Sequence, residues 1–149
     1  MDENAYRATY DDVNPLDCPF EKAILRGCCA CELSLKLNIA EREAVACKSP
    51  VARENCGTLR ELLRHNAQFT LKLHHADEAL PYAKEIKVQC GGLRGLLHVI
   101  EPDPVGAVRP VQNVHGLMLA AHERFGSFED LPYSEIVKAI AVFEARPKR

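Results

Sequence analysis

The chain has 149 residues, of which 47% are hydrophobic and 27% charged, and its formal net charge at pH 7 is −2. These values are typical of one globular domain and exclude a disordered chain or a fibre. A chain with a slightly negative net charge has no excess of positive side chains to neutralise many phosphates, and no nucleic-acid partner is therefore expected. No run approaches the ~20 apolar residues of a membrane helix, and the acidic start is unlike a signal peptide. We therefore expect no membrane partner and a cytoplasmic location.

The first third of the chain predicts a tail followed by two helices. Residues 1–17 are acidic and lack apolar periodicity, which indicates a tail lying over the surface. Asp17 as an N-cap and Pro19 in the first turn predict a short helix to about Arg26. Over residues 32–46, helical spacing on one side is kept by Leu33, Leu37, Ala40 and Ala44. This spacing predicts a second helix.

The rest of the chain predicts further helices. Ser49-Pro50 is an N-cap followed by proline, and it begins the longest helix, near 24 residues, to about His74. A helix from about Pro81 to Ile100 contains Gly91-Gly92, a pair that permits a close helix crossing. After a proline-rich linker over residues 101–106, two amphipathic helices are expected at Val111–Phe125 and Pro132–Phe143. The predicted fold class is all-α, an irregular bundle of five or six helices with a cysteine-rich N-terminal part.

Three parts follow from this division. Residues 1–17 form the acidic tail, and residues 18–101 form a cysteine-rich helical metal-binding domain. Residues 107–149 contain no cysteine and form a C-terminal helical hairpin, expected to pack on the same domain.

The cysteine content is the one unusual feature of the composition. Of the seven cysteines, six lie within residues 18–56. An odd number of cysteines in a chain expected in a reducing compartment argues against a disulfide framework. Clustered thiols in that setting more often bind metal or carry out redox chemistry. The full set is Cys18, Cys28, Cys29, Cys31, Cys47, Cys56 and Cys90.

The spacing of these cysteines favours an iron–sulfur cluster. Residues 28–31 contain both a C-x-x-C and a C-x-C pair, so two sulfurs can converge from a short segment. Iron–sulfur clusters use thiolates, commonly four, whereas structural zinc is usually marked by paired knuckles, of which only one is present. The prediction is a 4Fe–4S cluster, with zinc as the alternative. The candidate metal ligands are Cys18, Cys28, Cys29, Cys31, Cys47 and Cys56.

Within this set we expect Cys18, Cys31, Cys47 and Cys56 to bind, together with one of Cys28 and Cys29. Cys90 lies on an apolar stripe and is interpreted as a core residue rather than a ligand. His115 and His122 share a helix face, and we expect them to be solvated or capped rather than half of a metal site.

Motifs of several enzyme classes are absent from the sequence, among them H-E-x-x-H, C-x-x-C-H and G-x-S-x-G. The predicted function is that of a small soluble cluster-binding protein in electron transfer, cluster handling or redox/oxygen sensing, with a redox or regulatory protein partner. Two alternatives stay open. One is a structural zinc site in a protein-interaction domain, and the other is a thiol-based sulfur-transfer or redox enzyme that uses Cys28, Cys29 or Cys90.

Overall fold

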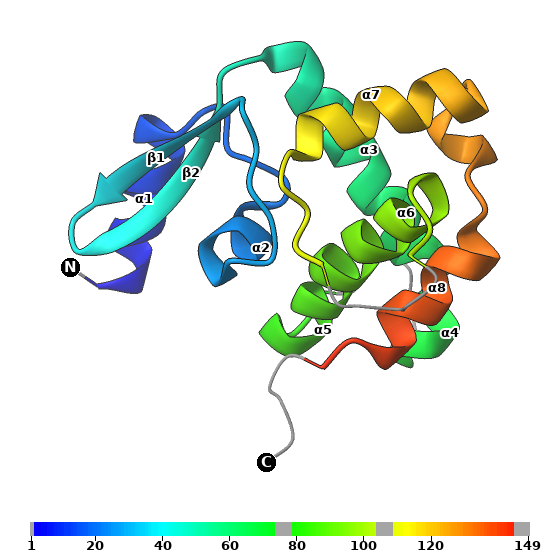
Figure 1. Cartoon of the computed structure of the whole chain (residues 1–149). Helices are drawn as coiled ribbons and strands as arrows, with labels where there is room; N and C mark the ends of the chain where they lie inside the picture. Colours follow the sequence, from blue (N-terminus) through cyan, green and yellow to red (C-terminus); the bar gives the residue numbers. More distant parts are fainter. Residues whose placement is uncertain (1, 74–78, 104–108, 145–149) are drawn as a thin grey trace.

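The fold is mostly helical, with one small β-hairpin on the N-terminal side (Figure 1). A computed structural model of the whole chain describes residues 2–73, 79–103 and 109–144. The expectation of a helical protein is confirmed, but the fold is not strictly all-α. Among the described residues no helix is both long and apolar enough to cross a bilayer.

The hairpin replaces the helix expected over residues 32–46, so that prediction is wrong. Strands β1 (Ser34–Ile39) and β2 (Arg42–Cys47) pair antiparallel, in a register that runs from Ser34↔Cys47 to Ile39↔Arg42. In β1 the apolar residues alternate with polar ones, which is the period of a strand. The turn contains Ala40 at φ 55° instead of the glycine or asparagine that marks such turns in sequence. The turn signal was therefore missing.

Residues expected to form a tail are helical, as α1 (Glu3–Val13), and this helix lies against the hairpin. Asp2 caps it by accepting a hydrogen bond from the Ala5 N–H at 2.7 Å. The Arg42 guanidinium lies 4.3 Å from the centre of the Tyr6 ring, which fixes α1 to β2. No residue of α1 is buried, so the helix needs no apolar stripe, and the sequence therefore lacked the periodicity that marks a helix.

The remaining N-terminal element is α2 (Glu21–Arg26), close to the short helix predicted there. After the hairpin, α3 (Pro50–Asn66) begins at the predicted N-cap, since Ser49 Oγ accepts from the Ala52 N–H at 3.1 Å. It ends earlier than expected, and the short α4 (Gln68–Leu71) follows Ala67.

The predicted helix over residues 81–100 is present as three consecutive segments. These are α5 (Tyr82–Ile86), a π-helical turn η1 (Lys87–Gly91) and α6 (Gly92–Ile100). The helix ends at Ile100, directly before the expected linker, although residues 104–106 of that linker lie outside the described residues. The two final helices are confirmed as α7 (Val114–Phe125) and α8 (Tyr133–Val142), joined by a 3₁₀ turn, η2 (Phe128–Asp130).

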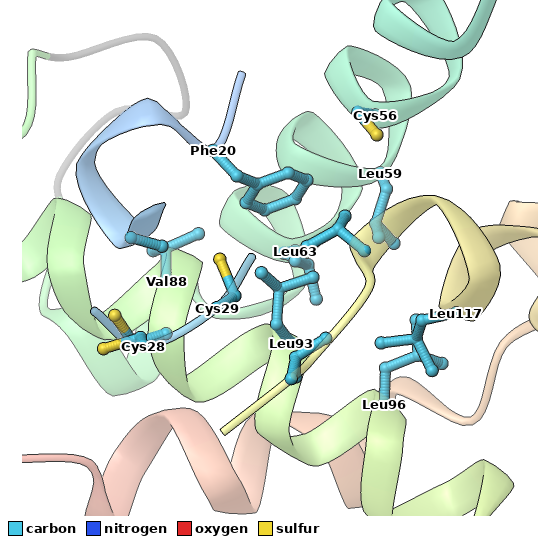
Figure 2. Packing of buried hydrophobic residues seen from close by; sticks show 14 of the residues in the cluster. Phe20, Cys28, Cys29, Cys56, Leu59, Leu63, Val88, Leu93, Leu96 and Leu117 are labelled. Atoms are coloured by element: carbon cyan, nitrogen blue, oxygen red, sulfur yellow. The ribbon is translucent and has the colours of Figure 1, made fainter. Parts of the chain in front are cut away.

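One hydrophobic core includes buried residues of α2, of β2 and of the helices from α3 to α8 (Figure 2). The predicted close crossing is confirmed. A Cβ on Gly91 would lie 2.8 Å from the Ile140 Cα of α8, and one on Gly95 would lie 3.0 Å from the Ile136 carbonyl oxygen. Figure 2 shows Cys56 at one edge of the core and Cys28 and Cys29 among its other members.

Candidate metal centre

Four cysteines that are far apart in the sequence line one pocket where the hairpin meets the helical part. Cys18 precedes α2, Cys31 lies between α2 and β1, Cys47 ends β2, and Cys56 lies in the second turn of α3. Figure 1 shows this junction, where β2 leads into α3 and α7 begins. The walls of the pocket are largely apolar and include Phe20, Ile24, Leu33, Ala52 and Val114. The free space between them is about 20 Å³.

Main-chain pairing brings Cys18 and Cys47 to the same side of the hairpin. The Cys18 N–H donates to the Val45 carbonyl at 3.0 Å, and the Cys47 N–H donates to the Leu16 carbonyl at 2.8 Å. Residues 16–18 therefore run beside β2 as a short third partner. This pairing fixes two of the four thiols with respect to each other, although 29 residues separate them in the sequence.

The segment that carries Cys31 is held by the residues just before α7. Gly27, with φ 86°, ends α2 in the left-handed conformation and lets the chain turn sharply. The Ala30 N–H then donates to the Val111 carbonyl, and the Val114 N–H donates to the Ala30 carbonyl, both at 2.9 Å. The position of Cys31 thus depends on a part of the chain that contains no cysteine.

Cys56 is placed by the start of α3, and Arg53 connects this helix to the segment of Cys18. Arg53 Nε donates to the Asp17 main-chain carbonyl at 2.9 Å, and its terminal nitrogen pairs with the Asp17 carboxylate. Arg53 also lines the thiol pocket, but its charge is already matched by Asp17. The two contacts hold α3 against the hairpin beside the pocket.

Burial is the main influence on the thiols. Burial and, to a smaller extent, the nearby Cys31 and Cys47 raise the pKa of Cys18 to about 12, although the hydrogen bond from the Phe20 N–H opposes the shift. Burial also raises the pKa of Cys56 to about 12, with additional effects from Cys18, Cys31 and Cys47. Without a metal, the Cys18 and Cys56 thiols are protonated at neutral pH. A metal would have to displace their protons to bind.

The four thiols share a pocket without meeting at a single point. Within residues 2–73, 79–103 and 109–144, no three Cys, His, Asp or Glu side chains are grouped closely enough to hold one metal ion. A tetrahedral zinc site needs all four sulfurs about 2.3 Å from one ion. The arrangement is therefore looser than a preformed single-ion site.

The other three cysteines lie in the hydrophobic core. Cys28 and Cys29 are each 7% exposed, and Cys90 is fully buried. The pKa of Cys90 is raised, first by burial and then by a hydrogen bond with Cys28. Burial likewise raises the pKa of Cys29, and the nearby Cys18, Cys28 and Cys31 add to this effect.

The pocket has a polar wall that the sequence did not indicate. His115 lines it, and the Nδ1 of His115 lies 2.8 Å from Oε1 of Glu32. The hydrogen bond from His115 holds the pKa of the Glu32 carboxyl below its usual range, and Asn113 adds to this effect. The Glu32 N–H donates to Asn113 Oδ1 at 3.1 Å. Since 83 residues separate Glu32 from His115, no local spacing could have revealed this pairing.

No family model, curated protein or solved structure matches this chain. The function therefore has to be argued from the pocket itself.

Proposed function

We propose that the chain binds a 4Fe–4S cluster through Cys18, Cys31, Cys47 and Cys56 and acts as a small redox protein. The observation that carries this proposal is the shared pocket, to which four separate segments each contribute one thiol. Four thiolates are the usual ligand set of a 4Fe–4S cluster, and apolar walls limit the access of water. Once bound, the cluster supplies one-electron chemistry. The chain supplies the four thiols, their spacing and their shielding from solvent.

The shared pocket bears on the choice between a cluster and a single ion. A cluster takes its thiolates on different irons, so the four sulfurs need not approach one point. A zinc ion would fit a space of about 20 Å³ but would require the sulfurs to contract around it. A cluster requires the opposite change, an outward rotation of the cysteine side chains. The free space of about 20 Å³ is too small for a cluster as it stands, so binding would require the cysteine side chains and the apolar walls to move apart.

Cys18, Cys56 and Cys90 are poorly suited to nucleophilic thiol chemistry. A reactive cysteine usually has a pKa lowered by a nearby cation or a helix N-terminus. Here burial raises the pKa of Cys18, Cys56 and Cys90. The proposal therefore covers electron transfer, cluster handling or redox sensing, with a redox or regulatory protein as partner, and ranks above a thiol enzyme that would use Cys90 as its nucleophile.

The test is anaerobic purification followed by analysis of iron, acid-labile sulfide and zinc, together with a visible spectrum. We expect equal amounts of iron and sulfide and a broad thiolate-to-iron charge-transfer band. Cys31→Ser and Cys56→Ser should each lose the band. Cys90→Ala is the matched control, because this residue is buried outside the pocket, and it should keep the band.

Three results would contradict the proposal. One is stoichiometric zinc without colour, and the second is protein that holds neither metal under anaerobic conditions. The third is retention of iron and of thermal stability by both Cys31→Ser and Cys56→Ser.

A further inference from the structure

A second cavity, of about 230 Å³, lies directly beside the thiol pocket between the start of α3 and α7. The two spaces share three wall residues, namely Ala52, Cys56 and His115. Cys56, which is 9% exposed, forms part of the wall of both spaces. A molecule held in the outer cavity would therefore contact the wall of the proposed cluster site.

The chemistry of this cavity selects against charged ligands. Its hydrogen-bonding side chains are Ser49, Asn55, His115 and His122, and its lining contains no Asp, Glu, Lys or Arg. A charged group that leaves water needs a paired charge, which these side chains do not supply. A thiolate-bound cluster next to Cys56 would be negative and would also repel an anion.

The size and the apolar surface of the cavity favour a single ring. The floor includes the buried Met118 and Phe128, and the edge of Phe128 faces the imidazole of His122 at 6.0 Å between ring centres. At the rim, Val51 and Leu119 are 70% and 58% exposed. A cavity of about 150 Å³ can hold benzene, so the space here admits a ring with one polar substituent.

From these observations we infer that the cavity binds a small uncharged aromatic molecule with a hydrogen-bonding substituent, next to Cys56. Val51, Leu119, Met118 and Phe128 would enclose the ring, and Asn55 and His122 would bind the substituent. The binding site itself is independent of the proposed cluster. Its consequence for the cluster rests on the proposed function, because the ligand would cover the outer side of Cys56.

Benzamide and benzoate make a matched pair of probes, since they have similar size and differ in charge. Titrated into the full chain and followed by ¹H–¹⁵N NMR, benzamide should shift the side-chain amide signals of Asn55, with a Kd in the millimolar range or below. Leu119→Trp fills the cavity and should weaken binding about tenfold or more. Val142→Trp changes an exposed residue outside the cavity and should leave binding unchanged.

The NMR titration decides the inference without any metal. It is overturned if benzamide causes no shift of the Asn55 signals at concentrations up to about 10 mM, because a Kd above that value would correspond to very weak binding. Equal binding of benzoate, or unchanged binding by Leu119→Trp, would overturn it as well. A separate experiment on iron-loaded protein tests the consequence. Benzamide should slow the loss of iron to a chelator in the wild type but not in Leu119→Trp. Equal rates with and without benzamide in the wild type would refute the link between the cavity and the cluster, but not the binding of benzamide itself.

Discussion

Asn113 offers a direct test of how Cys31 is held in place. It occupies the N-cap position of α7 with an extended backbone, but its side chain makes no hydrogen bond within that helix. Its Oδ1 instead accepts from the Glu32 N–H, the residue after Cys31. Serine is an equally good N-cap but is too short to bridge the two segments. Asn113→Ser should therefore keep or raise the stability of α7 while it releases the Cys31 segment.

The size of the effect follows from the loss of one hydrogen bond. Such a bond contributes about 0.5–1.5 kcal/mol, equivalent to a change of about 2- to 13-fold in an equilibrium or rate constant. We expect Asn113→Ser to lose iron to a chelator faster by this factor. Its free energy of unfolding, measured in urea without metal, should stay within about 0.5 kcal/mol of the wild type, because the serine N-cap offsets the lost hydrogen bond. Asn113→Asp keeps the acceptor oxygen but puts a second carboxylate beside that of Glu32, so it should restore slow iron loss only in part.

The reasoning would be refuted if Asn113→Ser released iron at the wild-type rate.

Two further predictions concern stability. Gly91→Ala should destabilise the protein by about 1–3 kcal/mol, because the new Cβ would lie 2.8 Å from the Ile140 Cα. Gly57→Ala should instead stabilise α3 by up to about 1 kcal/mol, because its Cβ would have no neighbour from another segment closer than 4.0 Å. Urea unfolding of both variants checks the pair, and equal effects would contradict the packing described. In the metal-free protein, folding raises the pKa values of Cys18 and Cys56 from 9.0 to about 12. The free energy of unfolding should therefore have its full value below pH 9 and decrease as the pH rises towards 12, where the unfolded chain has lost protons that the folded chain still holds. Anaerobic urea unfolding across this range should show a shallower fall in Cys56→Ala, and an identical pH profile would contradict the assignment.

Local signals in the sequence were sufficient for most helices. Ser49-Pro50 marked the start of α3 correctly, because an N-cap and a proline at the first position act through the backbone of neighbouring residues alone. The helix predicted over residues 32–46 was wrong because contacts between segments, not local signals, decide the conformation there. Leu33, Leu37, Ala40 and Ala44 have helical spacing, but pairing between the two strands decides their conformation.

The candidate site divides in the same way. Thiol chemistry and the concentration of cysteines pointed to residues 18–56, and four of the six candidates line one pocket. Sequence spacing could not separate these from Cys28 and Cys29, because burial in the core depends on contacts with distant helices. It also could not place His115, whose partner Glu32 belongs to a remote segment.

The dependence of Cys31 on the residues before α7 has a consequence for synthesis. The chain emerges from the ribosome N-terminus first, so Cys56 is made about 60 residues before His115. At about 5–20 residues per second, this interval lasts about 3–12 s. During that time the Cys31 segment lacks its hydrogen bonds to Val111 and Val114, and no closed pocket exists. All four thiols are therefore available to oxidants in the nascent chain, and delivery of the proposed cluster would follow completion of the first turn of α7.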